Sequence, residues 1–261
     1  MENNDITVIL NCYRRPQYLR PQILAILEQS VKPKEIWIWV NESEETKSFD
    51  WFIINDLVEK HNIRVVSSNY NWKYCGRFSL ACMVDTTWTA IFDDDTIPGT
   101  NWFANCLECM DNVHSDPHEN VPYPILGGVG VTLHQDDAYQ PNTRHGWVSA
   151  NEFRQKVDLV GHAWFFPAHY IQHMWRKKPM WDNGEDMHFS AMCQIYGGID
   201  TWVPPHPKND TSLWSSLHGV QLGVDSVASS ATKNHVEFYQ QRNECVKRLS
   251  KMGWISGQES N

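Results

Sequence analysis

The chain has no long hydrophobic run. No stretch of roughly 18 consecutive apolar residues, the length that a membrane-spanning helix needs, occurs in the sequence. The first residues, MENNDITVILNCYRRP, lack the basic n-region and the apolar core of a secretory signal peptide. The sequence therefore predicts a soluble, cytoplasmic protein without a transmembrane anchor.

Positive charge is also scarce. The chain has 22 Lys and Arg against 31 Asp and Glu, a formal net charge of −9. Proteins that bind nucleic acid through a basic surface rely on an excess of positive charge, so we expect no nucleic-acid partner. A small phosphorylated ligand is still compatible with this composition.

The cysteines form neither a disulfide framework nor a zinc motif. They number seven, an odd count, and are scattered through apolar segments, which is typical of reduced thiols in a cytosolic protein. Cys106 and Cys109 form a CxxC, but no second pair exists to complete a tetrahedral site.

What the chain does contain is a regular alternation of elements. The first 95 residues alternate short β-rich runs with helical patterns, an order that predicts an α/β fold with a mostly parallel central sheet flanked by helices. The expected strands span 6–10, 35–40, 63–68 and 88–92, and the expected helices span 18–29, 51–60 and 78–84.

The four strands all end in polar residues. Because ligands bind beyond the carboxyl ends of strands in such sheets, we expect these ends to converge on one crevice. The polar clusters are 11–15, 41–45, 67–71 and 93–95.

The rest of the chain mixes strands and helices. We expect a helix over 101–113, strands over 125–133 and 157–166, and helices over 168–176, 185–196 and 235–252. With no internal repeat or linker, 1–261 is predicted to be one domain.

The sharpest motif is the triplet Asp93, Asp94 and Asp95, directly after an apolar strand. Three adjacent carboxylates repel one another, and a cation offsets that repulsion. Mg²⁺ and Mn²⁺ bind through one or two carboxylates plus the phosphates of a substrate. The alternative is an acidic turn in which Asp93 or Asp95 caps the helix near residue 101.

A second acidic motif, Asp182-Asn183-Gly184-Glu185-Asp186, opens a helical pattern. Asp186 is the candidate general base for an attacking hydroxyl, with Glu185 or Asp182 orienting it. The alternative is a structural cap, because carboxylates are favourable at a helix N-terminus.

Six blocks in order carry a family resemblance: TVILNCYRRPQYL, WVNE, NYNWKYCGR, IFDDDT, VGHAWFF and NGEDM. Over about residues 6 to 220 the chain resembles nucleotide-sugar glycosyltransferases of the GT-A fold. It is most similar to the exostosin-like (family 64) enzymes and has some features of family two. The resemblance implies transfer of a sugar from a nucleotide diphosphate, usually a UDP-sugar, to an oligosaccharide or glycan acceptor. Mn²⁺ or Mg²⁺ on the aspartate motif would hold the diphosphate.

The resemblance also assigns residues. The nucleotide-sugar contacts that it implies are Asn11, Tyr13, Arg15, Asn41, Asn71, Arg77, Asp93 and Asp94. It implies a metal held by Asp95, Asp93 and a C-terminal histidine, His218, and a catalytic pair of Asp186 and Glu185.

The resemblance further divides the chain into a nucleotide-sugar-binding half (1–98), an acceptor and catalytic half (99–220) and a C-terminal helical segment (221–261). The loop from His114 to Pro124 and the segment 134–147 have no counterpart in the family, and acceptors are read by such variable loops. Exostosin-like enzymes retain the sugar's configuration, whereas the Gly-Glu-Asp motif resembles the acid pair of inverting family-two enzymes, so the stereochemical outcome stays open.

Three other functions compete with this one. A non-catalytic carbohydrate-binding protein would explain the 13 tryptophans but not the triplet. A nucleotidyltransferase usually needs a glycine-rich basic loop after its first strand, and NCYRRP has no glycine. A His/Asp metallohydrolase is disfavoured because the chain has no HExxH motif.

Overall fold

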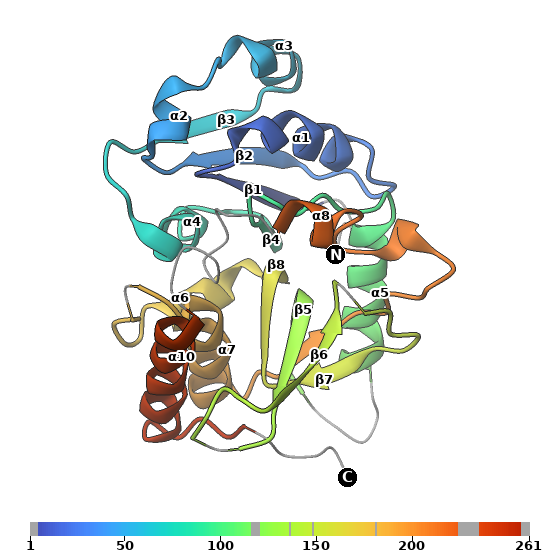
Figure 1. Ribbon diagram of the computed structural model, residues 1–261. Helices are drawn as coiled ribbons and strands as arrows, with labels where there is room; N and C mark the ends of the chain where they lie inside the picture. Colours follow the sequence, from blue (N-terminus) through green and yellow to red (C-terminus); the bar gives the residue numbers. More distant parts are fainter. Residues whose placement is uncertain are drawn as a thin grey trace.

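The computed structural model describes residues 5–115, 121–135, 137–147, 149–180, 182–223 and 235–256. In these residues one mixed nine-stranded sheet has the order β3-β2-β1-β4-β8-β5-β9-β7, and β6 pairs with β5 (Figure 1). Its strands are β1 (Ile6–Cys12), β2 (Glu35–Val40), β3 (Arg64–Ser67), β4 (Trp88–Phe92), β5 (Ile125–Leu133), β6 (Asn142–Gly146), β7 (Gln155–Val157), β8 (Leu159–Pro167) and β9 (Thr201–Val203).

The helices match most of the expected positions. They are α1 (Leu19–Leu27), α2 (Glu44–Ser48), α3 (Phe52–His61), α4 (Gly76–Ala81), α5 (Trp102–His114), α6 (Ile171–Met174), α7 (Glu185–Gly197), α8 (Gly219–Gly223) and α10 (His235–Ser250). Short 3-10 turns are η1 (Pro16–Tyr18), η2 (Lys73–Cys75), η3 (Ala168–Tyr170) and η4 (Thr211–Leu213). The helix expected over 168–176 is instead η3 followed by the short α6.

The sheet changes character at β4. Strands β3, β2, β1 and β4 run parallel, as the βα order requires. Beyond them β8 pairs antiparallel with both β4 and β5. The predicted α/β class is confirmed, and antiparallel pairing of β8 brings a second set of residues to the ligand-binding end of β4.

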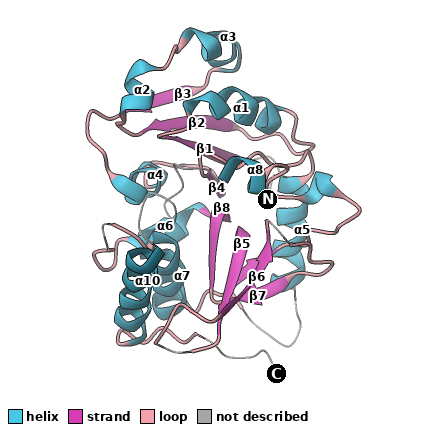
Figure 2. Ribbon diagram, in the orientation of Figure 1, coloured by secondary structure: helices cyan, strands magenta, loops and turns pink. Residues whose placement is uncertain are grey.

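Helices cover both faces of the sheet, as Figure 2 shows. Alternate residues of β1 enter different cores because successive side chains point to opposite faces. Ile6, Val8 and Leu10 pack with α1, α3 and α5, whereas Ile9 packs on the other face with α4, α6 and α7. All of β1 is buried, which confirms the expectation of a strand covered on both faces.

A third core joins α7 to α10, which lie side by side in Figure 1. Val246 and Leu249 of α10 pack in this core with Met187 and Ala191 of α7. The seven cysteines are free, as expected of reduced thiols. Among the described residues no helix is long and apolar enough to cross a membrane.

Candidate active site

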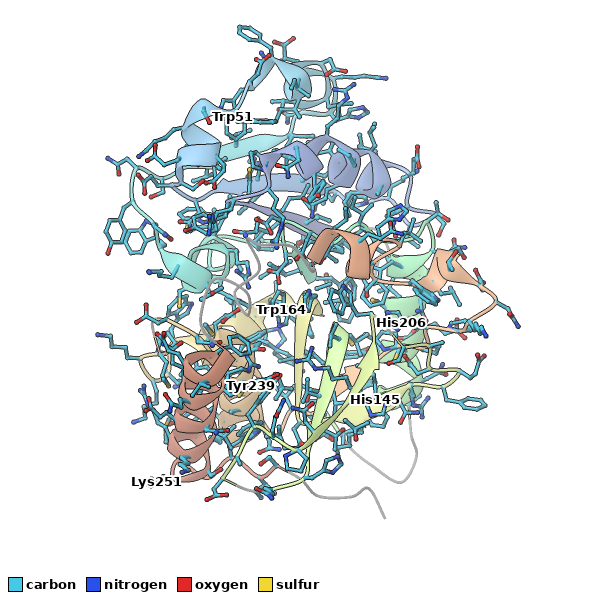
Figure 3. All side chains as sticks on the ribbon, viewed as in Figure 1. Trp51, His145, Trp164, His206, Tyr239 and Lys251 are labelled. Atoms are coloured by element: carbon cyan, nitrogen blue, oxygen red, sulfur yellow. The ribbon has the colours of Figure 1, made fainter. Side chains whose placement is uncertain are left out.

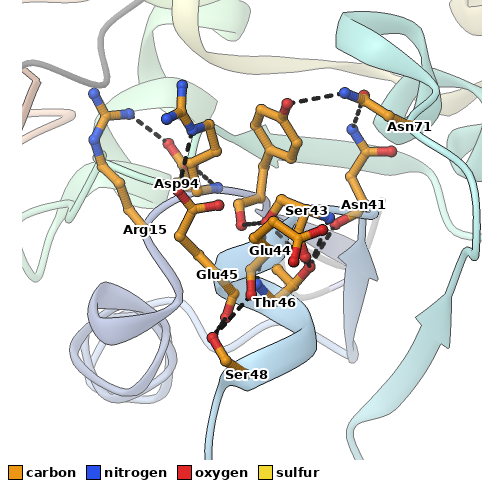
Figure 4. A network of polar contacts seen from close by, with 11 residues as sticks. Arg15, Asn41, Ser43, Glu44, Glu45, Thr46, Ser48, Asn71 and Asp94 are labelled. Carbon is orange, nitrogen blue, oxygen red and sulfur yellow. Dashed lines mark hydrogen bonds and ion pairs between the residues drawn. The ribbon is translucent and has the colours of Figure 1, made fainter.

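The four parallel strand ends meet, as the sequence predicts. Tyr13 follows β1, Asn41 follows β2 and Asn71 follows β3, and the Asn71 amide bridges the other two. It donates to the Tyr13 hydroxyl at 2.8 Å and accepts from the Asn41 amide at 2.8 Å (Figure 4). The end of β4 is linked to the end of β1 by Arg15, which donates to Asp94 at 2.9 Å (Figure 4).

Not all of these residues are open to a ligand. Asn41 is 1% exposed, and its side-chain amide oxygen (Oδ1) accepts from the Trp72 backbone N–H. It thus fixes the loop that carries Asn71, which is only half-buried. Asn11 is also buried, in the last part of β1. For both residues direct contact with a nucleotide stays a prediction.

The aspartate triplet divides its contacts among two arginines and a histidine. Arg77 lies 3.0 Å from Asp93, and Arg15 lies 2.9 Å from Asp94 and 3.4 Å from Asp95. His162 of β8 completes the set. The alternative of an acidic helix cap is wrong, because the N-cap residue of α5 is Asn101 and the first-turn backbone N–H of Phe103 donates to the side chain of Gln29 rather than to an aspartate.

Asp93, Asp95 and His162 form a candidate metal centre. Their ligand atoms lie within 4.8 Å of one another. The backbone N–H of Asp93 donates to the His162 carbonyl at 2.9 Å, so the pairing of β4 with β8 fixes the histidine beside the triplet. Sequence reasoning missed His162, whose block VGHAWFF offers no signal of this pairing.

The conformation of His162 supports a functional role. Its φ is 64°, in the left-handed region that side chains other than glycine rarely adopt. Its ring stacks on Trp147 with centroids 4.6 Å apart. The buried Nδ1 has no hydrogen-bond partner within the described chain and lies 3.8 Å from Asp95. Strain of this kind gathers at functional sites.

These donors fit a divalent cation. Two carboxylates and an imidazole nitrogen can ligate Mn²⁺, and the unpaired Nδ1 gains a partner when a metal binds. Mg²⁺ prefers oxygen ligands alone. His218 does not belong to this cluster: it is exposed, just before α8. Its role as a ligand stays a prediction.

Electrostatics differ along the triplet. Burial raises the pKa of Asp94 to about 6, the neighbouring Asp95 adds to the rise, and Arg15 opposes it. Burial likewise raises the pKa of Asp93, against the attraction of Arg77. For Asp95 burial is outweighed by His162 and Arg15 together, and the pKa is lowered. Asp95 is therefore the triplet member whose charge the surroundings favour most.

Arg77 connects the triplet to the second acidic motif. Its Nη2 lies 3.0 Å from Asp93 and 3.0 Å from Glu185. The guanidinium is buried and sits over the ring of Trp164 at 5.1 Å. Trp164 lies near the middle of the molecule (Figure 3). The Arg77 guanidinium thus contacts both the carboxylate that directly follows β4 and the first carboxylate of α7.

Helix α7 begins with the acidic pair. Its N-cap is Gly184 at φ 86°, and a Cβ there would lie 2.6 Å from the sulfur of Cys245 in α10. Gly184 itself has no side chain to cap the helix, but Asp186 accepts from the first-turn backbone N–H of Met187, so the structural alternative stays open beside the catalytic one. Burial, helped by Asp186 and opposed by Arg77, raises the pKa of Glu185 to about 7.

Asp186 and Asp182 make different contacts. Asp186 accepts from the Met187 backbone N–H at 2.8 Å and pairs with Arg242 of α10 at 2.7 Å. A Cβ on Gly161, the neighbour of His162, would lie 3.8 Å from Asp186. Asp182 is exposed and lies 3.6 Å from Lys73. The structure therefore brings Glu185 and Asp186 to the candidate metal centre from the other half of the chain.

A mixed sheet with an acidic triplet beyond its fourth strand and helices on both faces is the GT-A architecture. Residues 7–116 match the sequence model of Glycosyl transferase family 2. The match covers β1 to β4 and the triplet, whereas His162, Glu185 and Asp186 lie outside it. A search of curated proteins finds no match.

Two solved structures share the fold. S. aureus TarS 1-349 aligns with a TM-score of 0.51 and 13% identity over 77% of this chain and 60% of that one. A longer S. aureus TarS structure aligns with a TM-score of 0.50 and 12% identity over 77% and 36%. This chain therefore spans less than two thirds of the length of either. These matches do not confirm the finer resemblance to exostosin-like enzymes.

Proposed function

We propose that this protein is a metal-dependent glycosyltransferase that moves a sugar from a nucleotide diphosphate donor, a UDP-sugar, to a hydroxyl group of a glycan acceptor. One observation carries the proposal. Arg77 lies 3.0 Å from both Asp93 and Glu185, so a cation-binding cluster and an acid pair share one site. The family 2 match over residues 7–116 supports it.

The cation belongs on Asp93, Asp95 and His162. A bound divalent ion supplies positive charge for the departing diphosphate, which aspartates alone would repel. Arg77 and Arg15 are the positive side chains beside the cluster. We assign Arg77 to the diphosphate, since a phosphate group can replace one of its carboxylate partners.

The nucleoside is assigned to the ends of β1 and β3. Tyr13 and Asn71 are both half-buried, and the hydrogen bond between them holds their polar groups at the edge of the sheet. Asn41 supports this arrangement from below the surface through its bond to Asn71.

The acid pair carries the proton transfer. Asp186 takes the proton of the acceptor hydroxyl while the oxygen of that hydroxyl forms a bond to the anomeric carbon of the sugar. The bond from the anomeric carbon to the diphosphate oxygen breaks at the same time. The electron pair leaves with the diphosphate. The family 2 match favours this single displacement, with inversion, over the retaining route that the exostosin-like resemblance implies.

A panel of nucleotide sugars tests the proposal. Sugar release would be measured with Mn²⁺ and with excess EDTA, without an acceptor and with a mixture of oligosaccharides. We expect Mn²⁺-dependent release from at least one UDP-sugar. Binding of sugars with no nucleotide-sugar turnover would instead support a non-catalytic carbohydrate-binding protein.

A further inference from the structure

The candidate base Asp186 has a partner from a distant part of the chain. Arg242, in the middle of α10, donates to Asp186 at 2.7 Å and to the side-chain amide oxygen (Oδ1) of Asn183 at 3.1 Å. It is 6% exposed. The match to family 2 ends at residue 116, and nothing in the acidic motif predicts this contact.

Arg242 is itself held by a second segment. Its guanidinium lies 4.1 Å from the centre of the Tyr139 ring, a cation–π contact. The Tyr139 backbone N–H donates to Asn243 at 2.8 Å, and the Tyr139 hydroxyl accepts from Arg144 at 3.3 Å. Tyr139 is 2% exposed, and it belongs to the segment 134–147 that has no counterpart in the family.

Each oxygen of Asp186 thus accepts one hydrogen bond and keeps a second lone pair that can take a proton. Oδ1 accepts from the Met187 backbone N–H, and Oδ2 accepts from Arg242. A carboxylate held at both oxygens keeps one orientation, whereas a carboxylate held at one oxygen can rotate about its side-chain bonds. Because a base works only within hydrogen-bond reach of the proton that it takes, its orientation affects turnover directly.

We propose that Arg242 is a positioning residue that fixes Asp186 in its reactive orientation, and that Tyr139 holds Arg242 in place. This inference rests on the proposed function. It makes α10 and the segment 134–147 parts of the catalytic apparatus, although neither supplies a group that touches the substrate. Asp186 lies on α7, so three separate segments together present one carboxylate.

Arg242→Gln and Arg242→Lys test the role at two strengths. The first removes the charge and the fork of donors, whereas the second keeps a charge on a single nitrogen. Arg248→Gln is the matched control, because Arg248 is exposed on the same helix and donates to the backbone carbonyl of Lys178, which is no part of the candidate site. Tyr139→Leu removes the ring from under Arg242.

The expected result is a loss of kcat without a loss of donor binding. Arg242→Gln should lower kcat by about 10- to 100-fold, in the range that misplacing a catalytic group costs, with KM for the UDP-sugar within about threefold. Arg242→Lys and Tyr139→Leu should lose about tenfold or less. Each rate is measured well below that variant's melting temperature, so unfolding does not enter.

The double variant Asp186→Asn with Arg242→Gln separates positioning from a general structural role. If Arg242 acts through Asp186, the double variant should have the kcat of Asp186→Asn alone, because two residues that act as a unit are not additive. Multiplied losses, or an unchanged kcat in Arg242→Gln, overturn the inference while the wild type still turns over. Absence of turnover by the wild type across the whole panel overturns the proposed function, and this inference with it.

Discussion

The two halves of the sheet bring residues to the site in different ways. In the parallel half, Tyr13, Asn41, Asn71 and Asp94 each follow a strand, so the order of strands and helices places them together. In the antiparallel half, His162 comes from the pairing of β8 with β4, and Asp186 is held by a residue 56 positions away. The first half follows local sequence order, whereas the second depends on tertiary contacts. We expect the first to govern binding and the second turnover.

The largest effect is expected at Asp95, where the proposed function has the two halves share a cation. Asp95→Ala removes a carboxylate that lies 3.8 Å from His162. A bound metal contributes several kcal/mol of charge stabilisation, so we expect a loss of about a thousandfold or more in the rate of transfer. Excess EDTA should do the same to the wild type.

Asp56→Ala is the control for this loss, because Asp56 is an exposed aspartate that pairs with Arg20 in the parallel half. It should leave the rate unchanged. Full activity in excess EDTA would show that transfer needs no metal. The parallel and antiparallel halves of the sheet would then share no cation at Asp95.

Asp186→Asn should separate turnover from binding. A general base contributes about 10²- to 10⁴-fold, so we expect at least a hundredfold loss of kcat. The dissociation constant of the UDP-sugar should stay within a few-fold, and the melting temperature within a few degrees. Near-wild-type turnover would reassign Asp186 to structure and leave Glu185 as the candidate base.

Arg77→Ala should act mainly on binding. A charge-assisted hydrogen bond contributes about 1.5–3 kcal/mol, so UDP should bind about ten- to a hundredfold more weakly in calorimetry. Arg20→Ala, which removes a half-buried arginine of the same half that pairs with Asp56, is the control. An unchanged dissociation constant would move the diphosphate contact to Arg15 or Lys73.

The effect that does not involve turnover or binding concerns the pH dependence of stability in the metal-free protein. The pKa of Glu185 is raised to about 7 from an ordinary value of 4.5. The native state therefore holds this proton up to a higher pH than the unfolded state does. The free energy of unfolding should fall as pH rises from about 4.5 to about 7 and then level off.

Glu185→Gln mimics the protonated side chain and removes this dependence. Near pH 5 the variant and the wild type should have similar stability. At pH 8 the variant should be more stable by up to about 3 kcal/mol, the value of a shift of this size. Equal stability at both pH values, measured by urea unfolding, would show that ionised Glu185 is fully compensated by Arg77.

The sequence predicts the parallel half closely. The strands over 35–40 and 88–92 have the expected bounds, because continuous runs of β-branched and aromatic residues leave no competing pattern. The triplet Asp93 to Asp95 and the pair Glu185 and Asp186 were both recognisable, since each opens or follows a strongly patterned element. The rule for strand ends places the triplet with the other strand ends, whereas the approach of Glu185 to the triplet through Arg77 is a tertiary contact that this rule does not predict.

The missing parts are set by long-range contacts. His162 lies inside an apolar strand, and its ligand atom reaches the triplet only through antiparallel pairing with β4 and a left-handed backbone. The short strands β6, β7 and β9 have no periodicity of their own. Arg242 belongs to a mostly polar helix, α10, so the hydrophobic pattern of the sequence does not indicate that this arginine is buried.

Calorimetric titration of UDP with Mn²⁺ present and with excess EDTA present tests the central claim most directly, because Asp93, Asp95 and His162 can share a site with a diphosphate only through a cation. We predict binding of UDP in Mn²⁺ and at least tenfold weaker binding in EDTA. We also predict that His162→Ala reduces the difference between the two conditions, whereas Asp56→Ala leaves it unchanged. Equal affinity for UDP in Mn²⁺ and in EDTA would contradict the account.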